Sequence, residues 1–259
     1  MIFSKDYYNT SDDKKRCLWD IIFFNTRFYF YLKFFIIILK ANKVAQKGRF
    51  SDDEYCKIAD DTFKVLENCG GKIHIKGLEH VRAVDGPVVF IGNHMSILET
   101  FILPGLIIPF KPVSFVVKAS LINHRLFGAV MKATSPISVT RTDPKKDFKS
   151  VMFGGQKLIK EGRSIIVFPQ STRGEFVAEE FGSIGGKLAQ KANVTVIPIA
   201  LKTDFWSNGK FFKDYGRIFR SRKIFFEFGK PLGTEMDKKQ RHSEIIKFIA
   251  TKLKEWNSL

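Results

Sequence analysis

Short apolar runs recur along the chain, each separated from the next by a longer segment of mixed character. The run at residues 164–169, SIIVFP, is strongly apolar and ends at proline, whereas residues 72–77, KIHIKG, alternate with Ile73 and Ile75 on one face. Both patterns are typical of strands, the first fully buried and the second buried on one side. The predicted strands are 72–77, 88–91, 115–118, 136–141, 164–169, 194–201 and 223–231.

The segments between these runs carry helix signals. Ser51 precedes Glu54 by three residues, the spacing of a capping box, and the helix that follows ends at Gly70–Gly71. Asp143–Pro144 starts another helix, which extends to about Lys160. Further helices are predicted at residues 123–133, 187–191 and 235–257. Strands that alternate with helices in this way indicate an α/β sheet layered with helices, with ligands at the carboxyl ends of its strands.

Residues 17–40 are rich in aromatic side chains, yet polar residues interrupt them. The cleanest apolar part, residues 34–39, is far shorter than the roughly 20 residues that a spanning helix needs. A helix that lies in the membrane interface, or re-enters it, keeps the polar groups near the headgroups. We therefore favour this arrangement over a spanning helix and over a buried core helix. The interrupting residues and the basic flank that suits anionic lipid are Asp20, Asn25, Arg27 and Lys33, then Lys40, Lys43, Lys47 and Arg49.

Charge strengthens the case for an anionic partner. The 259 residues include 43 Lys and Arg against 26 Asp and Glu, a formal net charge of +17, together with 27 Phe. Such a charge suits a membrane surface, a phosphorylated small molecule or nucleic acid. The sequence has no recognisable RRM, OB or helix-turn-helix signature, so we predict no nucleic-acid partner.

The first residues and the cysteines bear on location. Residues 1–16 are charged and polar and lack the apolar core of a cleavable signal peptide. Cys17, Cys56 and Cys69 show neither CxxC pairing nor zinc-like spacing with His, which indicates a reducing compartment and no zinc site. These features predict a membrane-associated protein on the cytoplasmic face, with residues 1–50 as an amphipathic helical membrane segment and residues 51–259 as the main domain.

The stretch NHMSILE, residues 93–99, places polar groups where the chain otherwise resembles buried core. His94 and Glu99 would point about 140° apart on one continuous helix. They can cooperate only if His94 lies in a turn before the helix, with Asn93 as its N-cap and Glu99 in its first two turns. A carboxylate bound to one imidazole nitrogen orients the ring and leaves the other nitrogen basic. The pair is then a candidate general base, although an HxxxxE spacing alone also fits a cap-and-core pair without chemistry.

The stretch FPQSTRG, residues 168–174, is a second polar cluster that directly follows a predicted strand. Arg173 is suited to bidentate phosphate binding, and Thr172 with the loop N–H groups can add donors. Lys118 stands at the end of another predicted strand. Each cation taken alone also fits a solvated surface charge.

Both clusters resemble motifs of one known family. NHMSILE is similar to the NHxxxxD motif, and FPQSTRG to the FPEGTR motif, of the glycerophospholipid acyltransferases that include the PlsC-type 1-acylglycerol-3-phosphate acyltransferases. Residues 115–141 and 194–201 resemble the segments that carry the family's phosphate-binding groups and its apolar closing motif. The resemblance covers residues 72–230 and implies the glycerolipid acyltransferase fold, a mixed, largely parallel sheet flanked by helices, within residues 51–259.

The resemblance also implies a reaction. His94 would take the proton from the hydroxyl of a lysophospholipid, most simply 1-acylglycerol-3-phosphate, which attacks an acyl thioester of CoA or acyl-carrier protein to give phosphatidic acid. Glu99 would orient His94, and backbone N–H groups near the pair would stabilise the oxyanion. The implied phosphate-binding residues and acceptor-site loop residues are Lys118, Arg141 and Arg173, then Asn93, Gln170, Ser171 and Thr172. The reaction needs no metal and no resident cofactor.

Three departures from the motifs bear on the acceptor. Glu99 replaces Asp, which gives a longer arm, and Gln170 and Ser171 replace Glu and Gly. A different lysolipid acceptor is therefore one alternative. A lipid esterase with Ser96 or Ser171 as nucleophile is another, although Ser96 lacks a GxSxG elbow. A third is an inactive membrane-binding protein, and the pattern carries no prediction of oligomeric state.

Overall fold

The computed structural model describes residues 6–170 and 172–258, so Ser171 lies outside the described residues. Within them, eight strands form one mixed sheet in the order β1-β2-β8-β7-β3-β6-β4-β5. The five strands β3 to β7 run parallel, β8 is antiparallel to β7 and parallel to β2, and β1 is antiparallel to β2. The strands are β1 Tyr8–Asn9, β2 Ile73–Lys76, β3 Val89–Gly92, β4 Val113–Lys118, β5 Ile137–Val139, β6 Ser164–Val167, β7 Val196–Lys202 and β8 Ile224–Phe228.

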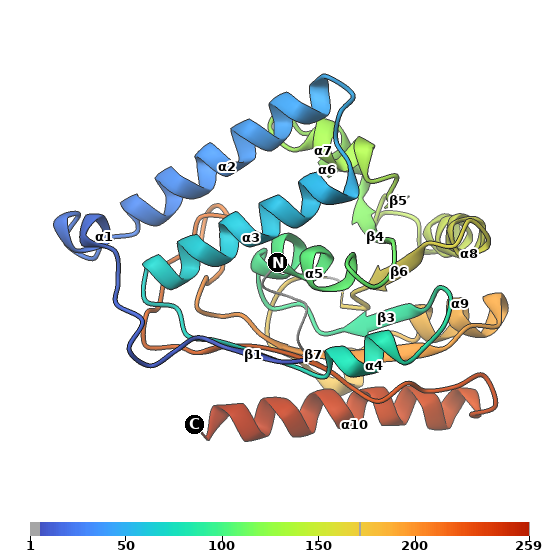
Figure 1. Ribbon diagram of the computed structural model, residues 1–259. Helices are drawn as coiled ribbons and strands as arrows, with labels where there is room; N and C mark the ends of the chain where they lie inside the picture. The colour runs from blue at the N-terminus through green and yellow to red at the C-terminus, as the bar shows by residue number, and fades with distance from the viewer. Residues whose placement is uncertain (1–5, 171, 259) are drawn as a thin grey trace.

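Helices cover both faces of this sheet, as the α/β prediction requires. Helices α2, α3 and α5 stack on one face, and α8, α9 and α10 pack on the other (Figure 1). The helices are α1 Leu18–Ile22, α2 Phe28–Gln46, α3 Asp52–Asn68, α4 Leu78–Arg82, α5 Leu98–Ile107, α6 Ala119–Ile122, α7 Gly128–Ala133, α8 Pro144–Lys160, α9 Ile184–Ala192 and α10 Lys238–Asn257, with a 3-10 turn at Ala178–Glu180. The predicted mixed, largely parallel sheet flanked by helices is confirmed.

The predicted helix starts are confirmed in their chemistry. The Ser51 side chain accepts a hydrogen bond from the Glu54 N–H at the start of α3, at 3.4 Å. The Asp143 side chain accepts from the N–H groups of Lys145 and Lys146 at the start of α8. These side chains satisfy backbone donors that the first turn of a helix leaves without partners.

The predicted helix at residues 123–133 is wrong at its start. The chain forms α6 and α7 instead, and a turn closed by a hydrogen bond from the Gly128 N–H to the His124 oxygen separates them. Gly128 lies so close to α6 that a Cβ atom there would stand 2.6 Å from the Ile122 oxygen. This close approach requires glycine, and the turn that allows it breaks the helix.

The N-terminal segment shares the core of the main domain. Strand β1 extends the sheet, and α2 packs against α3 and α7. Phe30 and Phe34 lie edge-on to the buried Trp206, with ring centroids 4.8 and 4.6 Å away. No helix in the described part of the chain combines the length and apolar character that crossing a membrane requires. The boundary at residue 50 stays a prediction.

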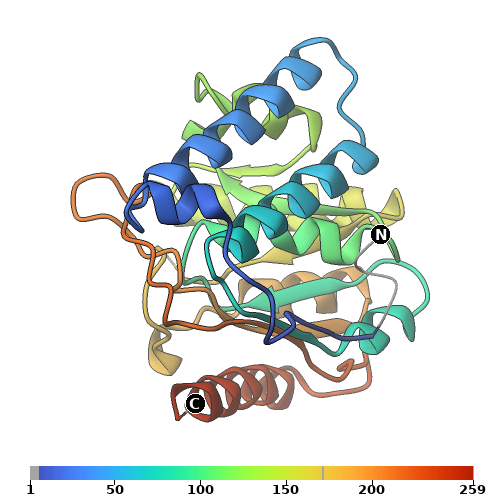
Figure 2. The same ribbon diagram turned by 60° about the vertical axis from the view of Figure 1, so that its left-hand side comes forward.

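A buried ion cluster ties α1 to a distant loop. The Asp20 side chain is fully buried and accepts hydrogen bonds from Arg16 and from Arg220, with Arg220 Nη2 2.7 Å from Oδ1. Burial raises the pKa of Asp20, but the bonds from the two arginines outweigh it and hold the pKa below its ordinary value. Arg220 ends the loop that follows β7, and Figure 2 shows this loop (orange) beside α1 and the start of α2 (blue).

Candidate active site

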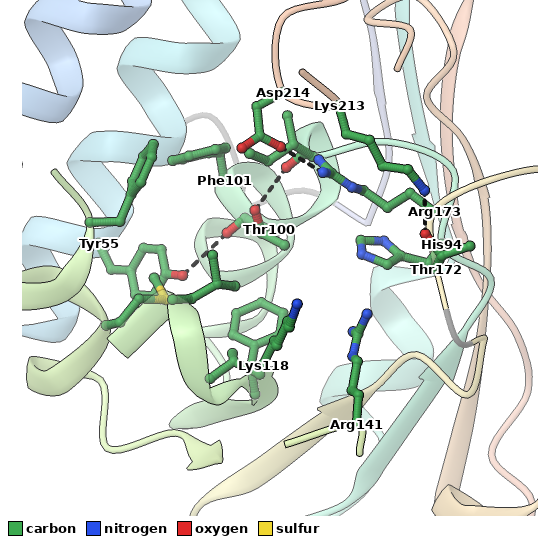
Figure 3. A pocket seen from close by; sticks show the side chains of 16 residues that line it. Tyr55, His94, Thr100, Phe101, Lys118, Arg141, Thr172, Arg173, Lys213 and Asp214 are labelled. Carbon is green, nitrogen blue, oxygen red and sulfur yellow. Dashed lines mark hydrogen bonds and ion pairs between the residues drawn. The ribbon is translucent and has the colours of Figure 1, made fainter. Parts of the chain in front are cut away.

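The carboxyl ends of the parallel strands meet at one cavity of about 410 Å³. His94 follows β3, Lys118 ends β4, Arg141 follows β5, and Arg173 lies in the loop after β6. All four side chains line the cavity, and Figure 3 shows them around one space. The structure therefore brings together the predicted base and the predicted phosphate-binding residues, as the position of ligands in such sheets leads one to expect.

The His94–Glu99 pair has the predicted geometry. His94 Nδ1 lies 2.5 Å from Glu99 Oε2, with His94 in the turn after β3 and Glu99 in the first turn of α5. Glu99 is fully buried, and its Oε1 accepts from the N–H groups of Met95 and Ser96 at 3.0 and 2.9 Å and from the Thr203 hydroxyl. Glu99 is therefore fixed at both oxygens. Because Nδ1 is engaged, Nε2 is the His94 nitrogen that can take up a proton.

Residues 168–174, the FPQSTRG stretch, contact both the backbone and the ring of His94. The His94 N–H donates to Gln170 Oε1 at 2.7 Å, and the Gly174 N–H donates to the His94 oxygen at 2.9 Å. The His94 ring stacks on Phe168, with centroids 4.3 Å apart and planes 6° apart. Gln170 thus supports the turn that carries His94.

Asn93 has a different structural role from the one predicted. Its side chain is fully buried, donates to the Leu201 oxygen at 2.7 Å and accepts from the Leu201 N–H at 2.9 Å. It therefore ties the end of β3 to β7 and does not line the cavity. The predicted N-cap role is wrong, because α5 begins after Ile97 and has no side-chain cap at that residue.

The N–H groups next to the pair are already engaged. Those of Met95 and Ser96 donate to Glu99, and that of His94 donates to Gln170. The expectation that N–H groups of this turn stabilise an oxyanion is therefore wrong for residues 94–96. The positive field in the cavity comes from side chains instead.

Cations dominate the mouth of the cavity. Burial lowers the pKa of Arg141, and the charge of Arg173 lowers it further, which indicates that the two guanidinium groups share one environment. Arg141 has a left-handed backbone, with φ 65°, and its N–H donates to the Asp147 carboxylate at 2.6 Å. Neighbouring cations repel one another, and an anion bound between them relieves the repulsion.

Two residues at this mouth had no signal in the sequence. Lys213 Nζ donates to the Thr172 hydroxyl at 2.5 Å, and the Asp214 carboxylate forms an ion pair with Arg173 at 2.6 Å (Figure 3). Both come from the loop after β7, which is closed by an antiparallel bridge between Trp206 and Ile218 and carries no recognisable motif. Only the folded chain brings this loop to the cavity.

The inner wall of the cavity is apolar. Helices α3 and α5, strand β4 and the α6–α7 segment supply it, and Tyr55 closes it with a hydroxyl that donates to the Thr100 oxygen at 3.2 Å. The apolar residues of the wall are Ile97, Phe101, Phe115, Val117, Leu121, Phe127 and Met131. A cavity with a polar mouth and an apolar wall suits a ligand that carries an aliphatic chain.

Among residues 6–170 and 172–258, no three side chains of His, Cys, Asp or Glu gather in a way that could hold a metal ion. That the reaction needs no metal stays a prediction.

The fold and the site define a class: an α/β protein with a His–carboxylate pair and an anion-binding rim at the carboxyl ends of its strands. The family model described as Acyltransferase matches residues 72–202, just over half of the 259 residues. The chain belongs to this family. The matched region contains both motifs that suggested the resemblance.

Named relatives agree with this assignment. The chain is 30% identical over 174 residues to a 1-acyl-sn-glycerol-3-phosphate acyltransferase of Pseudomonas aeruginosa, covering 66% of this chain and 64% of that protein. It is 31% identical over 133 residues to the chloroplastic enzyme LPAT1 of Arabidopsis thaliana, covering 50% and 36%. The chain is 23% identical over 205 residues to a 1-acyl-sn-glycerol-3-phosphate acyltransferase of Bacillus subtilis, covering 77% of this chain and 95% of that protein. The chain thus spans less than two thirds of the first two relatives.

A solved structure has the same fold. It is the 1-acyl-sn-glycerophosphate acyltransferase PlsC from Thermotoga maritima, with a TM-score of 0.70. The match covers 93% of this chain and 98% of that chain at 16% sequence identity. The similarity therefore shows the glycerolipid acyltransferase fold.

Proposed function

We propose that the protein is an O-acyltransferase that moves an acyl group from a thioester to the free hydroxyl of a lysophospholipid. The preferred acceptor is 1-acylglycerol-3-phosphate, and the product is then phosphatidic acid. The names of the relatives and the family membership support the acyl transfer. The cationic mouth supports an acceptor that carries a phosphate, and the apolar wall beside it supports a reaction that handles an acyl chain.

The proposed chemistry begins at Nε2 of His94. This nitrogen takes the proton of the acceptor hydroxyl while the hydroxyl oxygen attacks the thioester carbonyl carbon. The tetrahedral intermediate collapses, the C–S bond breaks, and the leaving thiolate takes the proton back from the imidazolium. Glu99 stabilises the imidazolium between these steps and fixes the ring orientation. The donor is acyl-CoA or acyl-carrier protein, and no resident cofactor takes part.

The acceptor phosphate would bind at the mouth of the cavity. Arg173 offers a planar fork of donors, and Lys118, Arg141 and Lys213 line the same space. Charged hydrogen bonds of this kind contribute about 1.5–3 kcal/mol each. The cations therefore determine which headgroup is accepted, whereas His94 acts as the base in the transfer step.

One observation carries the proposal above the others: the 2.5 Å contact between His94 Nδ1 and a fully buried Glu99, beside the cavity. The test supplies purified protein with labelled acyl-CoA or acyl-carrier protein and a panel of lysophospholipids, beside His94→Ala. We expect phosphatidic acid from 1-acylglycerol-3-phosphate and little product from His94→Ala. Full-rate transfer by His94→Ala would exclude His94 as the base, and release of free fatty acid in place of transfer would indicate a hydrolase.

The esterase alternative has less support. Ser96 is buried, donates its hydroxyl hydrogen bond to Thr203 Oγ1 at 3.0 Å and accepts from the Leu98 N–H. It does not line the cavity. Ser171, the other candidate nucleophile, lies outside the described residues.

We further propose that the protein acts at the surface of an anionic membrane on the cytoplasmic side. Apolar side chains of α1, α2, the turn between them and the loop after β7 are exposed on neighbouring parts of the surface. They are Leu18, Trp19, Ile21, Ile22, Phe24, Phe28, Leu32, Phe35, Ile36, Leu39, Phe211, Phe212 and Tyr215. An apolar surface of this kind, next to a basic flank, is typical of interfacial binding.

The membrane test uses point variants, because residues 8–46 share the core and their deletion would disturb the fold. Phe24→Glu changes a side chain on the apolar surface that is 88% exposed. Phe153→Glu, on α8 and 68% exposed, is the matched control. With vesicles that contain anionic lipid, we expect Phe24→Glu to reduce co-sedimentation and Phe153→Glu to leave it unchanged. Equal binding of both variants and the wild type would contradict the proposal.

A further inference from the structure

A second apolar groove, of about 300 Å³, lies outside the catalytic cavity. The outer side of α2 forms one wall, with Phe28, Leu32 and Phe35. Leu126, at the turn before α7, and Tyr215, in the loop after β7, complete the groove. The volume falls at the lower end of the range for ligand sites, about 300–1,000 Å³.

The groove and the cavity meet at shared residues. Ile97, Phe127 and Asp214 line both spaces. Asp214 is also the partner of Arg173, at 2.6 Å. A lipid whose phosphate lies at Arg173 therefore stands at the entrance to the groove.

Few polar side-chain groups line the groove: the hydroxyls of Tyr31 and Tyr215 and the carboxylate of Asp214. The Tyr31 hydroxyl donates to the Gly216 oxygen at 2.8 Å and accepts from Trp206 Nε1 at 3.0 Å. Asp214 is paired with Arg173. The remaining lining side chains are aliphatic or aromatic. This chemistry recognises a hydrocarbon chain with a polar group only at one end.

Transfer to a lysolipid brings two acyl chains together, one on the thioester and one on the acceptor. The apolar wall beside His94 suits the chain that is transferred, because the thioester carbon must lie next to the acceptor hydroxyl that His94 deprotonates. We propose that the groove between α2 and Phe127 holds the acceptor's own acyl chain, an inference that rests on the proposed function. Phe28, Leu32 and Phe35 at its rim are 54%, 41% and 43% exposed, so a lipid can enter the groove sideways from a bilayer.

The activity test uses the same substitution at two positions of α2. Leu32→Trp fills the groove, whereas Leu39→Trp adds the same side chain two turns away, where it does not line the groove. The two leucines are 41% and 43% exposed, so any change in membrane contact is common to both variants. The measured quantity is the ratio of kcat/KM for a long-chain 1-acylglycerol-3-phosphate to that for a short-chain one.

We expect Leu32→Trp to lower this ratio about tenfold, the effect of about two methylenes that lose their burial. Leu39→Trp should leave the ratio at its wild-type value. An unchanged ratio in Leu32→Trp would overturn the proposal, and so would an equal fall in both variants. A change in preference for the donor's chain length, without a change for the acceptor, would assign the groove to the donor and also overturn it.

A binding test separates this inference from the reaction itself. The wild-type protein, without any donor, is illuminated with a 1-acylglycerol-3-phosphate that carries a diazirine at the end of its chain. Cross-links at residues 28–35 or Tyr215 support the proposal, even if no acyl transfer is found and the proposed function fails. Cross-links at Leu121 or Met131 would place the chain in the catalytic cavity and overturn it, whatever the activity.

Discussion

The His94–Glu99 pair and the cationic mouth of the same cavity are held in opposite ways. Glu99 is fully buried, and both of its oxygens have partners: His94 and backbone N–H groups in the turn before α5, and the hydroxyl of Thr203, which follows β7. At the mouth, Arg173 is bound to Asp214, which is 38% exposed and belongs to the loop between β7 and β8. The pair is therefore part of the core, whereas the mouth depends on a loop.

The difference assigns separate tasks to the two regions. A buried network with every partner in place keeps one geometry, which a proton transfer needs. A partly exposed ion pair is worth little by itself and can exchange one anion for another. Substitutions in the pair should thus change kcat, and substitutions at the mouth should change the KM for the acceptor.

The largest effect is expected from Glu99→Gln. The amide cannot match both the imidazole and the two backbone donors, so His94 loses its orientation and the support of its charged form. We expect kcat to fall about 10²–10⁴-fold, the range for general-base assistance. Steady-state kinetics with saturating acceptor measure this. A rise in the acceptor's KM with an unchanged kcat would show that the His94–Glu99 pair serves acceptor binding, as the mouth does.

Arg173→Ala should give the opposite kinetic pattern. Removal of one guanidinium removes charged hydrogen bonds to the phosphate of about 1.5–3 kcal/mol, so the acceptor's KM should rise about 10–100-fold. The kcat at saturation and the KM for the donor should change little. Lys160→Ala, on the exposed end of α8 away from the cavity, is the control. A fall in kcat equal to that of Glu99→Gln would erase the distinction between the two regions.

Asp20→Asn tests whether the mouth depends on the N-terminal segment. The charged Asp20 binds Arg220 at the end of the loop that carries Lys213 and Asp214, and its pKa is held below the ordinary value. Loss of the charge should cost about 3 kcal/mol of stability at pH 7 and raise the acceptor's KM.

The pH dependence of this effect has a fixed direction. Because the folded pKa of Asp20 is lowered, its contribution is present above the unfolded pKa of about 3.9 and is lost as pH falls through the lower, folded value. Denaturant unfolding of wild type and Asp20→Asn should therefore differ most near neutral pH and converge in acid. A constant difference down to pH 3 would contradict the assignment.

Asp214→Asn should cause the smallest change, and it should lower the acceptor's KM where Arg173→Ala raises it. In the proposed binding mode, the Asp214 carboxylate competes with the acceptor phosphate for Arg173, and a partly exposed ion pair of this kind contributes about 0.2–1 kcal/mol. Its removal should lower the acceptor's KM by about two- to fivefold, as measured with a phosphate-bearing lysolipid. An increase in KM would mean that Asp214 positions Arg173 for binding and does not compete with the ligand.

The sequence predicted the parts of the site that depend on local geometry. The HxxxxE spacing required His94 before a helix and Glu99 inside it, and the two side chains meet at 2.5 Å. Ser51 was predicted as a cap from its spacing to Glu54, and it accepts from that N–H. Such features follow from contacts within about one helical turn, which sequence patterns encode directly.

The parts that depend on distant contacts could not be predicted. Asn93 fitted a helix cap by its neighbours, but its amide pairs with Leu201, 108 residues later. Lys213 and Asp214 reach the cavity across 41 residues from Thr172 and Arg173. The sequence of this loop has no helix or strand periodicity that could predict its position. Its position depends on how β7, β8 and α2 pack around it.

The central claim, that His94 and Glu99 act as one unit, is tested most directly by a double-mutant cycle. The rate of acyl transfer to 1-acylglycerol-3-phosphate is measured for wild type, His94→Ala, Glu99→Gln and the double variant. If Glu99 acts through His94, Glu99→Gln lowers the rate in the wild type but causes no further loss in His94→Ala. If the two losses multiply in the double variant, Glu99 acts independently of His94 and the claim is wrong.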